Sequence, residues 1–171
     1  MDAEALIDAL DRFRDVLPAL AGQVPASDRR WRPPGGGWTV LEILGHMANE
    51  EELDFRARIE STLADPRRPW VPIDPEGWVV ERRYDEADWD ATLARWSSER
   101  TRSVDWLRGL KGVDWSRRHD HPRLGPLRAG DLLVSWACHD ALHARQIARR
   151  AYERCLRDGE GFEARYAGPW T

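Results

Sequence analysis

The stretch Ser135–Gln146, SWACHDALHARQ, gives the strongest indication of the fold and of a functional site. It places His139 and His143 four residues apart, and in an α-helix that spacing puts both side chains on one face. The face is apolar, because the residues that share it are Leu132, Trp136 and Ile147. Residues 129–158 are therefore predicted to form one long helix whose apolar side carries two imidazoles.

Three further segments show apolar side chains at three- and four-residue steps: residues 2–21, 38–63 and 86–110. The second of these begins with a capping-box pattern, since Thr39 is followed three residues later by Glu42. The connections 67–85 and 111–127 are rich in proline and glycine, and nothing alternates with period two for long enough to predict a sheet. We therefore expect an all-α four-helix bundle with long crossover loops, formed as a single domain by residues 1–171.

Composition narrows the class of protein. The 171 residues include 42% hydrophobic and 33% charged side chains, which is typical of a globular domain with a core. The formal net charge is −4 and no basic run occurs, which argues against nucleic-acid binding. No apolar stretch approaches the roughly 20 residues that cross a membrane, and the acidic start does not resemble a signal peptide. Because two cysteines, Cys138 and Cys155, are too few for a disulfide framework, we expect a cytoplasmic protein with free thiols.

His46, on the second predicted helix, is the candidate for a third nitrogen ligand. The Nε2 atoms of an i, i+4 pair can converge on one divalent cation, and a third imidazole from a packed neighbour would complete a three-nitrogen face. An ion bound by such a face keeps coordination positions open for water or substrate. The alternative for any one of these histidines is a hydrogen-bonded core residue. The sequence therefore points to a metal site at His46, His139 and His143 without naming its reaction.

Other side chains near these histidines are candidates for supporting roles. Glu50 lies one turn after His46 and could be a fourth ligand, a carboxylate that orients a ligand, or a general base. The alternative is a solvated charge in the acidic run 50–52. Trp136, Arg145 and Gln146 flank the histidine pair and are candidate substrate contacts, with core or bundle-edge positions as the alternative. The segment His119–His121 offers two more imidazoles, but in an extended segment they would need a special turn to reach one ion.

Two stretches of the chain resemble the signatures of one family. Residues 37–47, GWTVLEILGHM, resemble the helix-two signature of the DinB/YfiT-like superfamily, a tryptophan followed by a helix with one histidine. Residues 130–147 resemble its helix-four signature, in which two histidines precede a glutamine, and Trp31 fits the pattern too. The resemblance implies a four-helix bundle that binds a divalent metal, commonly zinc or nickel, at the positions of His46, His139 and His143.

The resemblance also implies partners and reactions. Members are often homodimers, and some are thiol-dependent transferases or isomerases that use a low-molecular-weight thiol such as mycothiol or bacillithiol. Many other members have no assigned activity. Ala144 departs from several relatives, which carry a histidine directly after the last ligand, and this leaves the subfamily open.

These observations lead to three hypotheses about function. The first is a divalent-metal-dependent enzyme for a small-molecule substrate, a thiol-dependent S-transferase or isomerase in which the ion lowers the pKa of a bound thiol. Arg145, Arg149 and the pair Arg117–Arg118 are candidate contacts for that thiol. The second is a metal-dependent hydrolase, in which the same ion activates water. The third is a non-enzymatic, stress-associated bundle that binds a metal or ligand, and four protein ligands on the ion would indicate it.

Overall fold

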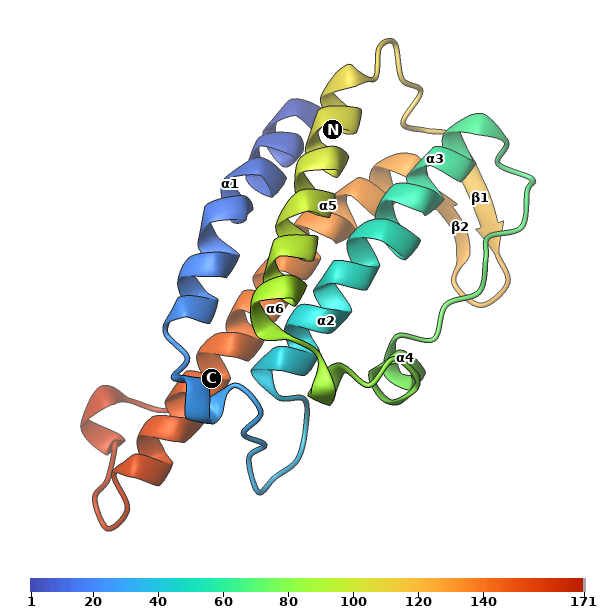
Figure 1. Cartoon of the computed structure of the whole chain (residues 1–171). Helices are drawn as coiled ribbons and strands as arrows, with labels where there is room; N and C mark the ends of the chain where they lie inside the picture. The colour runs from blue at the N-terminus through green and yellow to red at the C-terminus, as the bar shows by residue number, and fades with distance from the viewer. Residues whose placement is uncertain (171) are drawn as a thin grey trace.

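The computed structural model describes residues 1–170 and shows a helical bundle with a small hairpin at one end (Figure 1). Its helices and strands are α1 (Ala3–Gly22), α2 (Val40–Asn49), α3 (Arg56–Ala64), α4 (Pro75–Glu81), α5 (Trp89–Gly109), β1 (Arg118–His121), β2 (Gly125–Arg128) and α6 (Ala129–Asp158). A π-helical segment, η2 (Glu50–Phe55), joins α2 to α3. Short 3₁₀ turns lie at η1 (Ala26–Asp28), η3 (Tyr84–Glu86) and η4 (Arg165–Ala167).

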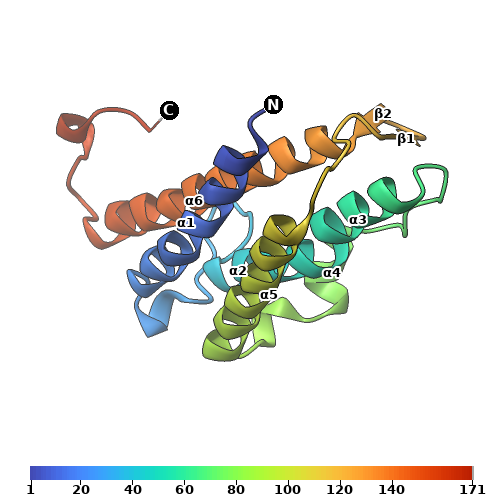
Figure 2. The same ribbon diagram turned by 90° about the horizontal axis from the view of Figure 1, so that it is seen from above.

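Four rods form the bundle: α1, α5, α6 and the run of α2, η2 and α3 (Figures 1 and 2). The first rod, α1, packs against α5 and α6, whereas α2 packs chiefly against α5. The first and second rods, and likewise α5 and α6, share no main interface although they are consecutive, so the connectivity differs from a simple up-down-up-down bundle. The predicted all-α four-helix bundle is confirmed.

Two clusters of buried apolar side chains hold the rods together. One joins α1, α2 and α5 and includes Leu44 and Trp96, and the other joins α1, α5 and α6 and includes Leu10 and Leu133. All four of these side chains are 0% exposed. Burial of apolar area stabilises a fold by about 25 cal/mol per Å². The clusters thus fix α2 and α6, the two rods that carry the candidate metal ligands, within one rigid body.

The second rod starts as the sequence predicts. The Thr39 side chain accepts the Glu42 backbone N–H at 3.2 Å, and the Glu42 carboxylate accepts the Thr39 N–H at 2.7 Å. This reciprocal pair satisfies two backbone donors that the first turn of a helix leaves free. The orientation of α2, and with it the position of His46, is therefore set from its first turn.

The single helix predicted over residues 38–63 is interrupted by η2, which a three- to four-residue pattern does not anticipate. In this wider turn the consecutive residues Glu50 and Glu51 are both buried, with 5% and 2% of their surface exposed. Such π-helical turns occur frequently at functional sites. The acidic run 50–52 is therefore not a solvated surface charge cluster, except at Glu52, which is exposed.

The two crossover connections contain more structure than the sequence indicates. Residues 67–85 include α4, which Asp74 caps and Pro75 opens. Residues 111–127 contain β1 and most of β2, so the expectation of no sheet is wrong. Each strand is only four residues long, and β1 is entirely polar, so neither shows an alternating apolar pattern. Gly125, with φ of 74°, begins the second strand in a conformation that favours glycine.

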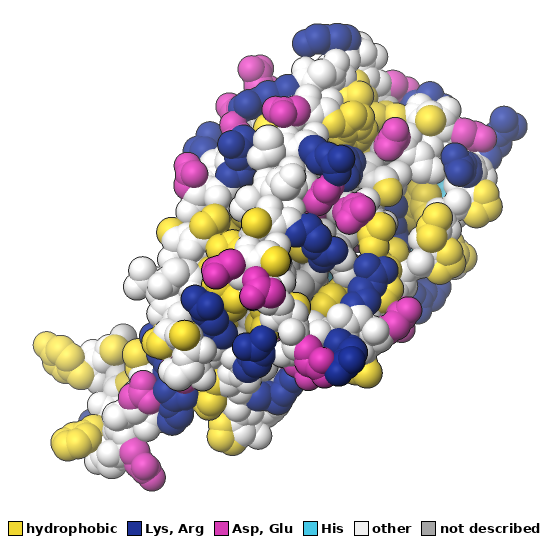
Figure 3. All heavy atoms as spheres, in the orientation of Figure 1, with side chains coloured by type: hydrophobic (Ala, Val, Ile, Leu, Met, Phe, Trp, Pro, Cys, Tyr) yellow, Lys and Arg dark blue, Asp and Glu magenta, His cyan; other side chains and the backbone are white. Residues whose placement is uncertain are grey.

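The surface carries mixed charge. Acidic and basic side chains intermingle on the face shown in Figure 3. Cys138 and Cys155 are both exposed free thiols, as predicted. Among residues 1–170, no helix has the length and apolar character that a bilayer crossing demands.

Candidate metal centre

The three predicted ligand histidines converge between α2 and α6. The Nε2 atom of His46 lies 3.2 Å from that of His139 and 3.1 Å from that of His143, and the last two are 3.0 Å apart. His46 is buried and the other two are half-buried. In residues 1–170 this is the one cluster of three or more histidine, cysteine or acidic side chains close enough to hold a metal ion.

The protonation of these rings suits metal binding. Burial lowers the pKa of His46 to about 3 and that of His139 to about 2, and it lowers the pKa of His143 as well. The neighbouring histidines lower the first two further, because the positive charges would repel one another. The rings are therefore neutral near pH 7, the form in which an imidazole nitrogen can bind a cation.

One hydrogen bond also fixes which nitrogen of His143 faces the cluster. Its Nδ1 atom lies 2.8 Å from the Gln146 side-chain oxygen, which can only accept a hydrogen bond. Nδ1 therefore carries the proton, and Nε2 turns its lone pair toward the other two rings. Gln146, predicted as a substrate contact, thus orients the His143 ring in this structure.

The spacing of the three nitrogens fits a divalent ion. With a metal–nitrogen distance of about 2.05 Å, separations of 3.0–3.2 Å correspond to nitrogen–metal–nitrogen angles of roughly 94–103°, between octahedral and tetrahedral values. Three converging imidazoles, with a lone pair directed inward at His143, form a donor set that a borderline-soft cation such as zinc or nickel matches. The residues present therefore fit the predicted metal.

Buried carboxyl groups lie beside this cluster. The Glu50 oxygen Oε1 is 3.7 Å from Nδ1 of His46, and neither atom has a hydrogen-bond partner among the described residues. Burial, and next the neighbouring Asp54, raise the pKa of Glu50 to about 9. Burial also raises the pKa of Asp54, which pairs with Arg58. Glu50 and Asp54 thus form an acidic pair that shares protons next to a ligand histidine.

A second polar cluster lies next to the first, and the sequence analysis missed it. Arg100 is 0% exposed and donates two parallel hydrogen bonds of 2.7 Å to the Asp140 carboxylate. It also donates from Nε to Glu51 at 2.8 Å and from Nη1 to the Leu10 carbonyl at 3.0 Å. The sequence does contain a sign of this cluster. Arg100 follows Trp96 by four residues and so lies on the apolar face of α5, where a charged side chain needs a buried partner.

The remaining predicted contacts occupy different surroundings. Trp136 is 1% exposed, and its indole N–H donates to Glu51 at 2.9 Å, which gives it a core position without a surface for substrate. Arg145 is exposed on α6. Arg149 pairs with Glu153 at 3.0 Å. Arg117 donates to the Ala64 carbonyl at 3.3 Å.

The histidines of the segment His119–His121 belong to the hairpin. The ring of His119 stacks on Trp70 with centroids 4.3 Å apart, and its Nδ1 lies 2.9 Å from the carbonyl oxygen of Pro66. The His121 Nδ1 atom accepts the backbone N–H groups of Arg123 and Leu124. Both imidazoles are used to hold the loop, and the described structure does not bring them to the ligand cluster.

Comparison with known proteins agrees with this geometry. No curated protein sequence matches the chain. Among solved structures, the chain is similar to YfiT from Bacillus subtilis, described as a probable metal-dependent hydrolase with an unusual four-helix bundle topology. The TM-score is 0.79 at 20% sequence identity, with 89% of this chain and 87% of that chain covered, so the likeness concerns the fold. The family model of the DinB superfamily matches residues 9–147, which is most of the chain, and the protein therefore belongs to the DinB superfamily.

Proposed function

We propose that this protein is a divalent-metal-dependent enzyme in which His46, His139 and His143 hold the ion. The observation that carries the proposal is the convergence of three Nε2 atoms within 3.2 Å of one another on two rigid rods. In residues 1–170 the cluster contains no fourth protein ligand. Three protein ligands with remaining positions open are typical of catalytic rather than structural metal sites.

The chain's own residues would prepare the site for chemistry. Gln146 holds the His143 ring with its Nε2 lone pair inward, and the Glu50 carboxyl lies 3.7 Å from Nδ1 of His46, on the side of that ring away from the cluster. When bound, the ion supplies Lewis-acid chemistry, which polarises a carbonyl oxygen or lowers the pKa of a water or thiol. The buried pair of Glu50 and Asp54 holds a proton near pH 7 and can donate it to a leaving group as a general acid.

Two reactions are consistent with this arrangement. Hydrolysis of a small-molecule substrate is supported by the buried carboxyl pair, since a carboxyl that keeps its proton near pH 7 can serve as general acid. The description of the similar YfiT structure also points to hydrolysis. Thiol-dependent transfer or isomerisation, with a thiol such as mycothiol or bacillithiol, is the second candidate, supported by the open coordination positions and by the family resemblance.

The test of the metal site is elemental analysis of the purified chain, together with His46→Ala, His139→Ala and His143→Ala. We expect about one zinc or nickel ion per chain in the parent and loss of that ion in each variant. His119→Ala and His121→Ala are matched controls, because they remove imidazoles outside the cluster. Equal metal content in the His143→Ala and His119→Ala proteins would overturn the assignment.

The test of the reaction uses the metal-loaded protein with a panel of ester and amide substrates, and separately with low-molecular-weight thiols and electrophiles. Turnover that the His139→Ala variant loses identifies the reaction class. If the loaded protein turns over neither panel and its ion exchanges no ligand, the bundle binds metal without catalysis. A large loss of thermal stability on chelation would support that alternative, because structural metal binding is coupled to folding.

A further inference from the structure

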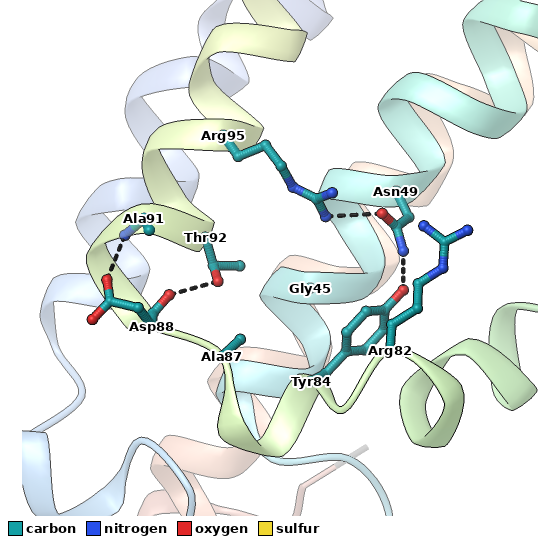
Figure 4. Close-up of a pocket in the computed structure, with 9 residues that line it drawn as sticks. All are labelled: Gly45, Asn49, Arg82, Tyr84, Ala87, Asp88, Ala91, Thr92 and Arg95. Atoms are coloured by element: carbon teal, nitrogen blue, oxygen red, sulfur yellow. Dashed lines mark hydrogen bonds between the residues drawn. The ribbon is translucent and has the colours of Figure 1, made fainter.

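A separate pocket lies between α2, η3 and the start of α5, and none of the three ligand histidines lines it (Figure 4). Its volume is about 260 Å³. The lining side chains used below are Asn49 from α2, Arg82 and Tyr84 from the connection that precedes α5, and Arg95 from α5. The space suits a small molecule or one functional group of a larger one.

Two guanidinium groups give this pocket a surplus of positive charge. Among residues 1–170, neither Arg82 nor Arg95 has a carboxylate within 4.0 Å, although the chain pairs many of its other arginines. Arg95 donates one hydrogen bond of 2.8 Å to the Asn49 side-chain oxygen, and Arg82 lies over the Trp78 ring at 4.5 Å. Most N–H groups of these two arginines are therefore available to a ligand.

The single acidic residue among the pocket's lining side chains is already engaged. Asp88 accepts the Ala91 backbone N–H at 2.8 Å and so caps the first turn of α5. Thr92 donates its hydroxyl to the Asp88 backbone oxygen at 2.6 Å. Neither residue neutralises the two arginines, and Figure 4 shows both side chains directed at the helix end rather than at Arg95 or Arg82.

A buried tyrosine adds a neutral donor. Tyr84 is 4% exposed, and its hydroxyl oxygen accepts a short hydrogen bond from the Asn49 amide, which is itself 0% exposed. The phenol O–H has no acceptor among the described residues. Burial raises the pKa of Tyr84 against the opposing effect of Arg82 and Arg95, so the proton stays on the oxygen. A β-carbon at Gly45 would lie 2.8 Å from the Tyr84 ring, and the glycine is therefore needed for this placement.

We propose that this pocket binds an oxyanion, the carboxylate or phosphate group of a small molecule, between Arg82, Arg95 and the hydroxyl of Tyr84. Guanidinium groups match the planar oxygen pairs of carboxylate and phosphate, and such charge-assisted hydrogen bonds are stronger than neutral ones. The oxyanion is the acceptor that the Tyr84 O–H lacks. The site does not depend on the metal, and it stands whether or not the chain is an enzyme.

The experiment titrates the full chain with inorganic phosphate and, in a second arm, with acetate, at constant ionic strength near pH 7.5. Binding is followed by calorimetry and by the shift in Tm, which rises when a ligand binds the folded state. Both arms use the His139→Ala variant after chelation, so that an anion cannot bind through a metal ion. Saturation with phosphate or with acetate supports the site and identifies which anion it prefers.

Variants assign the binding to this pocket. We expect Arg82→Gln and Arg95→Gln each to raise the Kd at least tenfold, and Tyr84→Phe to raise it severalfold. Arg83→Gln is the matched control, because Arg83 is the next arginine in the chain, pairs with Glu86 and does not line the pocket. The proposal is overturned if neither anion saturates, or if Arg83→Gln weakens binding as much as Arg82→Gln does. Tm without anion confirms that each variant is folded.

Discussion

Two neighbouring polar clusters of the bundle differ in how completely their buried polar atoms are hydrogen-bonded. Arg100, Glu51 and Asp140 bind one another through short hydrogen bonds inside the core, and among the described residues only Oε2 of Glu51 in this closed cluster lacks a partner. The three candidate ligand histidines form a more open cluster, in which His46 lies one turn before Glu50, and both His46 Nδ1 and Glu50 Oε1 are buried without partners among the described residues. A closed cluster holds a fold together, whereas unpartnered buried atoms beside three converging imidazoles favour a bound ligand.

The largest expected effect concerns the closed cluster. Arg100→Met leaves the carboxylates of Glu51 and Asp140 buried without their partner, and we expect a loss of about 3–5 kcal/mol in the free energy of unfolding. Urea denaturation measures it. The control is Arg102→Met, since Arg102 lies on the same helix with a side chain 67% exposed. If both variants lose the same stability, the Arg100 cluster is not the element that holds the rods.

The next largest effect concerns Glu50, at the edge of the histidine cluster. Glu50→Gln keeps the shape of the side chain but removes the ionisable carboxyl group 3.7 Å from His46, and we expect metal affinity to fall about 10–100-fold. Competition with a chelator of known affinity measures the change. Glu52→Gln serves as the control because Glu52 is an exposed member of the same acidic run. Unchanged affinity in the Glu50 variant would remove its proposed role.

The third prediction uses pH on the chelated protein. Burial lowers the pKa of His46 to about 3, whereas the unfolded chain protonates this histidine near 6.5. The stability that neutral His46 contributes is therefore present above pH 6.5 and is lost as pH falls toward 3, at about 1.4 kcal/mol per pH unit. The free energy of unfolding should fall more steeply with decreasing pH, between about pH 6.5 and 4.5, in the parent than in His46→Phe. The difference in slope should correspond to one proton. Parallel curves would contradict the burial of a neutral ring.

The smallest effect separates a core histidine from a ligand histidine. His119→Ala removes the stacking on Trp70 and the hydrogen bond to Pro66, and we expect a loss of about 1 kcal/mol with no change in metal content. Thermal denaturation measures the stability, and elemental analysis measures the metal content. A loss of metal in this variant would show that the hairpin contributes to the ligand cluster after all.

Much of the site was predictable because it depends on helix periodicity. The i, i+4 spacing of His139 and His143 puts both rings on one face in any α-helix, and the resemblance pointed to His46 as their partner. The burial of Glu50 and Glu51 was not predictable, because it depends on a π-helical turn that no spacing rule anticipates. The hydrogen bond that fixes Trp136 in the core was not predictable for a related reason, since its partner Glu51 is 85 residues away in sequence.

The sequence by itself determined which residues form rods and which face of each rod is apolar, because these follow from local spacing and from caps such as that at Thr39. Only the tertiary structure decided which polar side chains meet. Arg100 reaches Glu51 across 49 residues and Asp140 across 40, and Arg82 shares a pocket with Arg95 only because α5 folds back along α2. Electrostatic pairing depends on distance in space, and the order of residues along a chain does not encode that distance directly.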